Sequence, residues 1–232
     1  MLQVYLHNIS NQSFAVKEAY KFLRTNILFS GSGIKVICFT SCIPNEGKSN
    51  VSFNLSVYLA ESGKKVVFID ADLRRSDIME RYKPDLSVFG LTHYLSAQNK
   101  IDDILYETNI DNLDIIFPGP VPPNPSELLG SDSFSDLLEI FRTVYDYIII
   151  DTPPIGSVTD SAVVAQKCDA TVLVIEANTI GYKFAQRVVY QLEKSGSRIL
   201  GAVLNKYEYD GRPYGYKNIK YKKYTDYYSG GY

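Results

Sequence analysis

The sequence has few cysteines and no long hydrophobic run. Its 232 residues include three cysteines, and because no two of them form a C-x-x-C pair, their spacing indicates neither a disulfide framework nor a zinc or iron–sulfur site. No apolar run approaches the roughly 18–20 residues of a membrane-spanning helix, and residues 1–13 lack the pattern of a signal peptide. We therefore expect a cytoplasmic protein with reduced thiols, which needs a partner to act at a membrane.

The sequence also lacks an excess of charge of either sign. The formal net charge is -2 at pH 7, with 22% charged and 45% hydrophobic residues, a balance typical of ordinary globular proteins. There is no overall basic charge that would favour nucleic-acid binding. A chain of this length can bury one substantial core without disulfides or structural metals.

Short apolar runs rich in valine and isoleucine recur along the chain. Because several are apolar at consecutive positions, we expect strands buried on both faces, as in a parallel sheet covered by helices. The predicted strands are Val36–Phe39, Val66–Ile69, Leu113–Phe117, Tyr147–Ile150, Thr171–Ile175 and Ile199–Leu204. The predicted helices cover residues 14–29, 49–62, 131–144, 159–167 and 181–195, and the proline-rich residues 117–125 predict a stiff loop. This alternation predicts a doubly wound α/β fold, with a mostly parallel sheet and helices on both faces.

The C-terminal residues differ in composition from the rest of the chain. Residues 207–232 contain nine of the nineteen tyrosines, five Lys and Arg against three acidic residues, and almost no aliphatic side chains. We predict one domain over residues 1–206 and a flexible, disordered tyrosine-rich tail over residues 207–232. Two other interpretations of the tail remain open: an arm that binds single-stranded nucleic acid and an adhesive low-complexity segment.

A glycine–lysine–serine sequence follows the first predicted strand and opens a helix. In a phosphate-binding loop of this kind, Gly47 lets the backbone approach the ligand, Lys48 reaches the β- and γ-phosphates and Ser49 holds magnesium. The match to G-x-x-x-x-G-K-[ST] is imperfect, because Cys42 stands where the first glycine belongs. The alternative is an ordinary strand-to-helix turn.

Two other predicted strands end in carboxylates. Asp70 and Asp72 follow one strand, and Asp151 follows another. Alternation along an extended backbone directs Asp70 and Asp72 to one side, at the carboxyl edge where α/β sheets bind ligands. A single aspartate there is often only a helix cap, but three carboxylates at one edge repel one another without a cation. We therefore expect Mg²⁺, with Asp151 orienting a metal-bound water.

Together these motifs resemble those of the bacterial tyrosine kinases (BY-kinases) that regulate capsular polysaccharide and exopolysaccharide export. These kinases belong to the deviant P-loop ATPases, which include the MinD and ParA partition proteins. The resemblance covers nearly the whole chain, and it rests on P-x-E-G-K-S, D-x-D-x-R, I-D-T-P-P, the G-P-x-P-P-N-P-S-E-L-L stretch (119–129) and L-N-K (204–206). It implies a P-loop fold and a non-specific protein-tyrosine kinase that uses ATP and Mg²⁺. Such a kinase phosphorylates its own C-terminal tyrosines in trans and regulates polysaccharide synthesis and export.

The resemblance also implies roles for individual residues. The catalytic residues are Lys48, Asp70 and Asp72. The metal-binding residues are Ser49, Asp70 and Asp151. The ATP-binding residues are Asn45, Glu46, Gly47, Lys48, Ser49, Asn50 and Asn205. The phosphoacceptors are Tyr214, Tyr216, Tyr221, Tyr224, Tyr227, Tyr228 and Tyr232. The oligomerisation residues are Glu18, Lys21 and Arg24, although the same charges also suit a solvated helix face with intrahelical pairs.

Two departures from the family pattern bear on these expectations. Asn45 replaces the usual loop glycine, and no lysine lies between Lys35 and Lys48, where partition ATPases carry an early loop lysine. The missing lysine favours a kinase over the main alternative, a MinD/ParA-type partition or positioning ATPase. A metal-cluster carrier ATPase and a non-catalytic nucleotide-binding subunit are further alternatives.

The resemblance finally implies partners and a location. A ring-like homo-oligomer is expected, together with a tyrosine phosphatase and a membrane-bound activator or adaptor of the polysaccharide co-polymerase type. The activator recruits the kinase to the inner face of the cell membrane. No nucleic-acid partner is expected.

Overall fold

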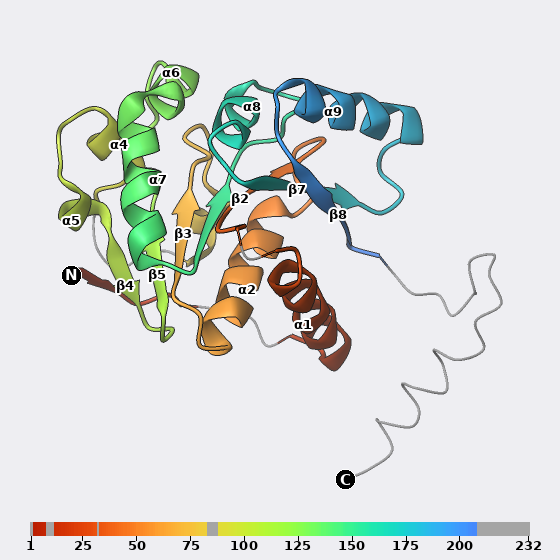
Figure 1. Ribbon diagram of the computed structural model, residues 1–232, viewed down its shortest axis with the longest axis horizontal. Helices are drawn as coiled ribbons and strands as arrows, with labels where there is room; N and C mark the ends of the chain where they lie inside the picture. The colour runs from red at the N-terminus through yellow and green to blue at the C-terminus, as the bar shows by residue number, and fades with distance from the viewer. Residues whose placement is uncertain (1, 8–11, 32, 83–87, 208–232) are drawn as a thin grey trace, which may run out of the picture.

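The computed structural model describes residues 2–7, 12–31, 33–82 and 88–207, which form an eight-stranded sheet covered by helices on both faces (Figure 1). The strands are β1 (Leu2–Val4), β2 (Val36–Ser41), β3 (Val66–Asp70), β4 (Tyr106–Thr108), β5 (Leu113–Ile116), β6 (Tyr147–Asp151), β7 (Ala170–Glu176) and β8 (Ile199–Asn205). The helices are α1 (Phe14–Leu28), α2 (Lys48–Glu61), α3 (Asp77–Tyr82), α4 (Leu91–Leu95), α5 (Ile101–Ile104), α6 (Pro125–Gly130), α7 (Asp132–Val144), α8 (Asp160–Ala165) and α9 (Tyr182–Lys194).

The strand order brings the ends of three central strands together. The order is β1-β4-β5-β3-β6-β2-β7-β8, and neighbouring strands are parallel except for β4 and β5. Strand β6 lies between β2 and β3, so the segments that follow these three strands meet at one edge of the sheet. The predicted mostly parallel α/β sheet is thus confirmed.

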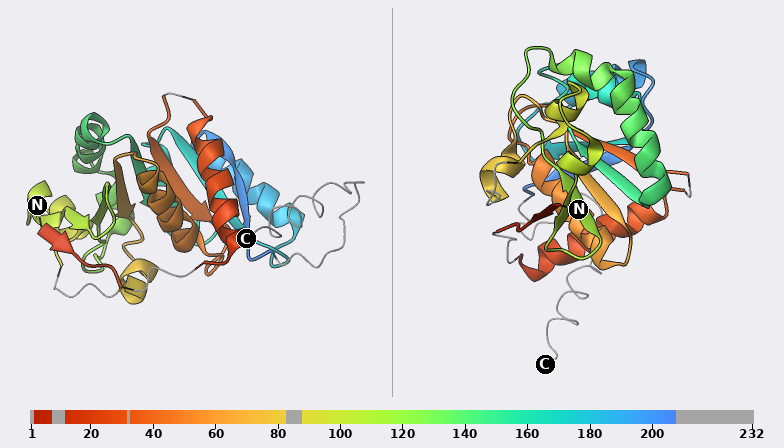
Figure 2. Two further views of the ribbon diagram at one scale, coloured as in Figure 1. Left: turned by 90° about the horizontal axis from the view of Figure 1, so that it is seen from below. Right: turned by 90° about the vertical axis from the view of Figure 1, so that its left-hand side faces the viewer.

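The central strands are buried on both faces. In β2, Ile37 and Phe39 pack with residues of α1 and α2, whereas Val36 and Cys38 pack on the opposite face with residues of α7 and α8. Figure 2 shows helices on either side of the sheet. Full burial of one such apolar side chain stabilises the fold by about 1.5–3 kcal/mol. This two-sided burial explains why the strand sequences are continuously apolar.

The predicted elements are all present, with ends that differ by at most two residues from the predicted ones. The sequence patterns missed β1, β4, α3, α4, α5 and α6, because elements of 3 to 6 residues are too short to display a period. Helix α6 begins at Pro125, the last residue of the predicted loop 117–125, since proline is favoured in the first turn of a helix.

Helix α1 leaves part of its apolar surface uncovered. Ile27 is buried, but Phe14 and Phe22 are 65% and 69% exposed. The helix packs on α2 partly through Tyr20, whose ring stacks on that of Tyr58 with centroids 5.4 Å apart. Two aromatic side chains of α1, Phe14 and Phe22, therefore remain exposed.

Candidate active site

The loop between β2 and α2 has the backbone geometry of a tight ligand-binding turn. Gly47 adopts φ +88°, and a Cβ atom at this position would lie 2.2 Å from Asn205 Nδ2, so only glycine fits. Asn45 also lies in the left-handed region, with φ 67°. Asparagine is one of the few other residues that tolerate this conformation. The loop therefore accommodates asparagine in place of the family's usual glycine.

Two predicted ATP-binding residues direct their side chains into the protein and brace this loop. The buried carboxylate of Glu46 accepts hydrogen bonds from the main-chain N–H groups of Ile43, at 2.8 Å, and Glu176, at 3.2 Å. Asn205 Nδ2 donates to the main-chain carbonyl of Glu46 at 2.9 Å. These contacts tie the loop to the ends of β7 and β8 and hold its main chain in place.

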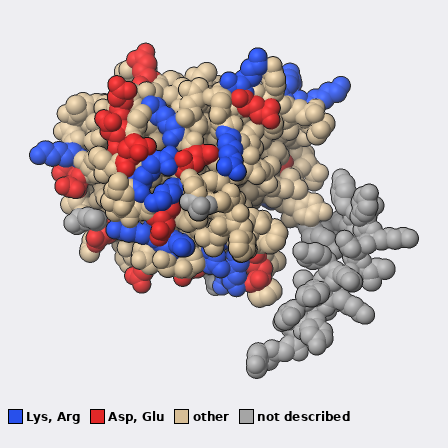
Figure 3. Space-filling model, viewed as in Figure 1, with Lys and Arg blue, Asp and Glu red and all other residues tan. Residues whose placement is uncertain are grey.

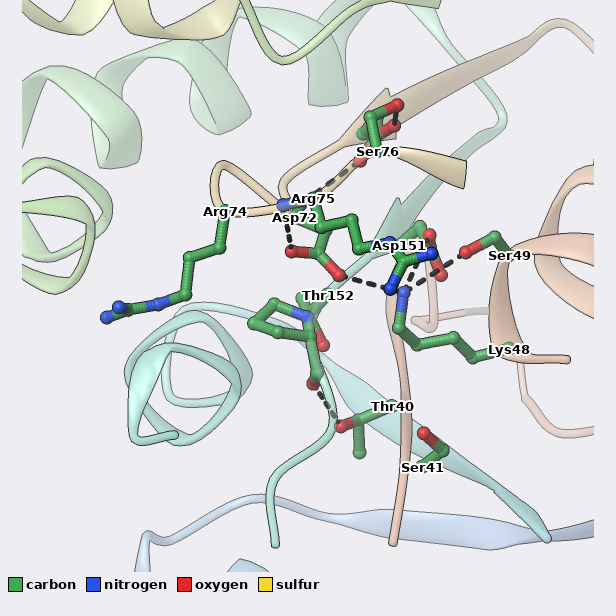
Figure 4. Close-up of polar contacts among 12 residues, drawn as sticks. Thr40, Ser41, Lys48, Ser49, Asp72, Arg74, Arg75, Ser76, Asp151 and Thr152 are labelled. Atoms are coloured by element: carbon green, nitrogen blue, oxygen red, sulfur yellow. Dashed lines mark hydrogen bonds and ion pairs between the residues drawn. The ribbon is translucent and has the colours of Figure 1, made fainter. Parts of the chain in front are cut away.

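Lys48 lies at the centre of the predicted site (Figure 4). Its Nζ lies 3.0 Å from Asp72 Oδ2 and 3.4 Å from Asp151 Oδ2, and it donates to Ser49 Oγ at 3.1 Å. Burial alone lowers the pKa of the lysine, but the carboxylates of Asp151 and Asp72 outweigh burial and raise that pKa above its ordinary value. Lys48 is therefore a fixed positive charge at the carboxyl edge of the sheet.

The two carboxylates of the D-x-D motif lie in different environments. Asp70 is fully buried and accepts a hydrogen bond from Ser76 Oγ at 2.5 Å and one from the main-chain N–H of Asp72 at 3.1 Å. Burial, followed by the nearby Asp151, raises the pKa of Asp70 well above its ordinary value. Asp72 instead lines a pocket next to Lys48. Of the two predicted catalytic aspartates, Asp72 is thus the one whose side chain lines this pocket.

Asp151 completes the group and is held from two sides. Its Oδ1 accepts a hydrogen bond from Ser52 Oγ at 3.3 Å, while its Oδ2 faces Lys48. Burial raises its pKa despite the neighbouring ammonium group. The structure therefore brings Lys48, Ser49, Asp72 and Asp151 into one cluster, and Asp70 lies opposite Asp151 in the register of β3 and β6.

Two depressions lie against this group. One, of about 190 Å³, has Lys48 and Asp72 in its wall. Its apolar lining comes from Pro44, Pro153, Pro154 and Val158, and its other charged lining residues are Arg74, Arg75 and Asp77. The second is lined by the predicted ATP-binding residues Asn45, Gly47, Asn50 and Asn205, together with Arg81 and Lys206. The phosphate-binding loop therefore borders two depressions, one with a mainly apolar lining and one with polar and apolar lining in similar amounts.

A forked ion pair, which the sequence patterns missed, holds the D-x-D-x-R segment against α8. Arg74 Nε and Nη2 lie 2.7 and 3.0 Å from the two oxygens of buried Asp160, which also accepts a hydrogen bond from Ser126 Oγ. Burial opposes ionisation of Asp160, but the hydrogen bonds from Arg74 and Ser126 lower its pKa below the ordinary value. An aspartate in the first turn of a helix gave no signal of this contact, because it suits any helix N-terminus.

The oxygen donors of the site fit magnesium that arrives with a nucleotide. Among the described residues, no group of three or more His, Cys, Asp and Glu side chains could hold a metal by itself. Mg²⁺ is usually bound by one or two carboxylates together with substrate phosphates. The hydroxyl of Ser49 and the carboxylates of Asp70 and Asp151 are ligands of this type, so a resident, protein-only metal cage is not required.

The remaining predicted residues lie apart from this site. On α1, Lys21 Nζ pairs with Glu18 Oε1 at 2.7 Å, and Arg24 Nη1 donates to the main-chain carbonyl of Tyr58 at 3.2 Å. Their assignment to oligomerisation stays a prediction. The predicted phosphoacceptors lie outside the described residues: Tyr214, Tyr216, Tyr221, Tyr224, Tyr227, Tyr228 and Tyr232.

The described surface carries charges of both signs. On the face shown in Figure 3, Lys and Arg side chains are interleaved with Asp and Glu side chains. Across residues 2–7, 12–31, 33–82 and 88–207, none of the helices combines the length and the apolar character needed to span a bilayer.

The fold and the site define a P-loop nucleotide-binding protein of the α/β class. A family model described as "AAA domain" matches residues 34–199. The tyrosine-protein kinase CpsD of Streptococcus agalactiae is 42% identical over 204 residues, covering 88% of this chain and 89% of the relative. The kinase domain of Escherichia coli tyrosine kinase ETK superposes with a TM-score of 0.81 at 34% identity, covering 90% of this chain and 84% of that chain. The septum site-determining protein MinD of Pyrococcus horikoshii OT3, complexed with Mg-ADP, superposes with a TM-score of 0.64 at 28% identity, covering 75% of this chain and 71% of that chain.

This chain belongs to the bacterial tyrosine-protein kinases, and residues 34–199 match the AAA domain family. The predicted enzyme class, a protein-tyrosine kinase, is thereby confirmed. The likeness to MinD extends over a smaller part of the chain and reflects the shared P-loop fold.

Proposed function

We propose that this kinase transfers the γ-phosphoryl group of ATP, bound with Mg²⁺, to tyrosines in the C-terminal tail of a second copy of the chain. The observation that carries the proposal is the placement of Lys48 Nζ, 3.0 Å from Asp72 Oδ2 and 3.4 Å from Asp151 Oδ2, beside an apolar-walled pocket. A phosphate-binding cation, a candidate base and a space suited to an aromatic ring thus adjoin one another. The resemblance to BY-kinases extends the proposal to the regulation of capsular polysaccharide and exopolysaccharide synthesis and export.

The chain's own groups supply binding, orientation and a proton acceptor. Main-chain N–H groups of the loop and the ammonium of Lys48 bind the phosphates. Ser49, Asp70 and Asp151 would hold Mg²⁺, which, when bound, neutralises phosphate charge. The phenolic oxygen forms a bond to the γ-phosphorus as the bond to the β–γ bridging oxygen breaks and ADP leaves. Asp72 accepts the phenolic proton, and because a tyrosine pKa is about 10, this transfer need not precede attack.

We also propose that copies of the chain assemble into a ring and that phosphorylation of the tail dissociates it. Glu18, Lys21 and Arg24 on α1 would join copies into a ring, in which one copy's tail reaches its neighbour's site. Each phosphate adds about -1.5 to -2 charges, so a few of them reverse the charge of a tail that has five basic and three acidic residues. The phosphorylated tail would then leave the acidic site and the ring would dissociate, until a tyrosine phosphatase resets it.

We further propose that a partner protein brings this kinase to the membrane. The resemblance to BY-kinases implies a membrane-bound activator of the polysaccharide co-polymerase type. We extend this to the present chain as a cytoplasmic kinase that such a partner recruits to the inner face of the membrane. If a partner recruits the kinase, the chain should co-purify with membranes only when the partner is co-expressed. Recovery of equal amounts of the chain in the membrane fraction without the partner would contradict recruitment.

The catalytic proposal can be tested by intact-mass analysis. The pure full chain is incubated with Mg²⁺ and ATP, and its mass is then measured. We expect successive additions of phosphate on tail tyrosines, and none in Lys48→Met. Lys183→Met, which removes an exposed lysine on α9, is the matched control and should behave as the unmodified chain does. ADP production without phosphotyrosine would favour a partition-type ATPase, and neither product would favour a non-catalytic subunit.

Transfer between copies has its own test. An isotopically labelled Lys48→Met chain is mixed with the unlabelled active chain and Mg²⁺-ATP, so that mass alone separates the two. Phosphate on the labelled copy is the expected result, because that copy cannot phosphorylate itself. Phosphate confined to the unlabelled copy would contradict transfer in trans.

A further inference from the structure

Three cationic side chains line the pocket beside Asp72, and two of them already have carboxylate partners. Lys48 lies 3.0 Å from Asp72 Oδ2, and Arg74 lies 2.7 Å from Asp160 Oδ2. Arg75 is exposed, and within the described part of the chain its guanidinium group has no ion pair or hydrogen bond. Arg75 is therefore the cation in this wall that remains available to an incoming anion.

The backbone fixes Arg75 next to the candidate base. The main-chain N–H of Arg75 donates to Asp72 Oδ1 at 3.1 Å, so its side chain starts directly beside that carboxylate. Figure 4 shows the side chains of Arg74 and Arg75 diverging: Arg74 extends away from Lys48, and Arg75 extends toward the side on which Lys48 lies. Arg75 thus reaches the rim of the pocket and does not join the ion pairs at its base.

The rest of the pocket wall suits the ring of a tyrosine. Pro44, Pro153, Pro154 and Val158 provide apolar surface on which a phenol ring can pack. A ring seated there with its hydroxyl group at Asp72 leaves the neighbouring residues of the acceptor at the rim, because a bound peptide continues on both sides of its tyrosine. Arg75 is placed to meet one of those neighbours.

The acidic residues of the tail all stand next to tyrosines. Residues 207–232 contain three of them, and Glu208 and Asp210 flank Tyr209, while Asp226 directly precedes Tyr227. In a segment whose other charges are basic, a carboxylate beside a tyrosine is the group that an unpaired guanidinium selects, because the two form a forked, charge-assisted pair.

We propose that Arg75 is a specificity-determining residue that pairs with a carboxylate directly preceding the acceptor tyrosine, which makes Tyr227 the preferred acceptor in the tail of a second copy. This inference rests on the proposed function. Tyr209 also follows an acidic residue, but it lies only three residues after Lys206, whose Nζ is held at 2.8 Å from the main-chain carbonyl of Asn45. Three residues of extended chain span at most about 11 Å, so Tyr209 has a much shorter reach from this anchor than Tyr227.

Peptides of residues 223–232 test the pairing, with the full chain as the enzyme and phosphorylation measured site by site. With Asp226 present, Tyr227 should be the main product, and Asp226→Asn in the peptide should raise KM by about tenfold with little change in kcat. Arg75→Ala should remove the difference between the two peptides. Arg75→Glu should reverse it, so that the Asp226→Lys peptide becomes the better substrate.

The matched control is Arg198→Glu, which makes the same charge change at an exposed arginine before β8, away from the carboxyl edge of the sheet. The Arg198→Glu chain should prefer the natural peptide over the Asp226→Asn peptide, as the unmodified chain does. If the unmodified chain used the natural peptide and the Asp226→Asn peptide equally well, the assignment would be overturned. The same holds for an Arg75→Ala chain that has a raised KM for ATP and loses activity equally on both peptides, since Arg75 would then act on the nucleotide. Phosphorylation of no tyrosine at all would contradict the proposed function itself.

Discussion

The two aspartates of the D-x-D motif are separated by one residue and differ in what surrounds them. Asp70 is fully buried at the end of β3 and accepts a hydrogen bond from Ser76, whereas Asp72 lines the pocket beside Lys48. A buried, hydrogen-bonded carboxylate suits charge balance and metal binding, and a carboxylate at a pocket suits proton transfer. The motif therefore combines two tasks that the residue type alone does not distinguish.

This division predicts different kinetic defects for the two aspartates. Asp72→Asn should lower kcat for tail phosphorylation by about 100-fold or more while ATP affinity is kept, because a proton acceptor is lost. Asp70→Asn should weaken binding of ATP in the presence of Mg²⁺. Single-turnover rates and equilibrium binding of ATP separate the two effects. If Asp72→Asn lost ATP binding and kept its rate at saturation, the assignment would be wrong.

Gly156 links the I-D-T-P-P segment to the phosphate-binding loop through a very close approach. A Cβ atom at this position would lie 2.1 Å from the main-chain oxygen of Cys42. Gly156→Ala should therefore push the loop out of place, cost about 1–3 kcal/mol of stability and weaken ATP binding. Gly181→Ala is the control, because nothing lies within 4 Å of its Cβ position. Calorimetric binding and urea unfolding measure both effects, and equal behaviour of the two variants would contradict the prediction.

At the scale of whole elements, the carboxylate of Asp169 connects the start of β2 to helix α7. Asp169, which precedes β7, accepts from the main-chain N–H groups of Lys35 and Val36, both at 2.8 Å. It also forms a forked pair with Arg142 of α7, at 2.9 and 2.8 Å. Burial opposes ionisation of Asp169, but these hydrogen bonds lower its pKa below the ordinary value.

Because folding lowers the pKa of Asp169, its ionised carboxylate stabilises the folded protein. Folding lowers the pKa of Asp169, so the stabilisation is fully present above the unfolded value of about 3.9 and is lost as the pH falls through the lower folded value. Asp169→Asn should reduce the free energy of unfolding by about 1–3 kcal/mol at pH 7. The difference from the unmodified chain should shrink in strong acid.

Urea unfolding across this pH range provides the measurement. Glu139→Gln is the control, because Glu139 contacts the same Arg142 from an exposed position and should change stability by about 0.5 kcal/mol or less. If Asp169→Asn lowered the free energy of unfolding by the same amount in strong acid as at pH 7, ionisation of Asp169 would not be the source of its stabilising effect.

The strands that local sequence identifies most directly are those buried along nearly their whole length. Strands β2, β3 and β6 have apolar residues on both faces, so local sequence alone identifies them. Short elements such as β1 and α5 could not be predicted, because contacts distant in the sequence hold them. The same applies to the site: the loop and the D-x-D motif are local patterns, whereas the contact of Arg74 with Asp160 joins residues 86 positions apart. An apolar side chain predicts burial whether or not a partner surface exists within the chain, so sequence alone does not indicate that Phe22 is exposed.

At the scale of the whole molecule, α1 is the element to test for self-association. Phe22 is 69% exposed between the predicted oligomerisation residues Lys21 and Arg24. Phe22→Ser should therefore lower the sedimentation coefficient of the assembled protein without changing its urea unfolding midpoint. Tyr182→Ser on α9, which removes another exposed aromatic side chain (76%), is the control and should leave assembly intact. Identical sedimentation of the unmodified and Phe22→Ser chains would exclude this face from the assembly.

The central claim is that Lys48, Ser49, Asp70, Asp72 and Asp151 serve a single metal-bound triphosphate at the carboxyl edge of the sheet. A crystal structure of the full chain with Mg²⁺ and a non-hydrolysable ATP analogue tests this claim most directly. We expect the γ-phosphate at Lys48, the metal beside Ser49 and Asp151, and an open path from the phosphorus to the pocket at Asp72. A nucleotide bound elsewhere, or a γ-phosphate turned away from that pocket, would contradict the account.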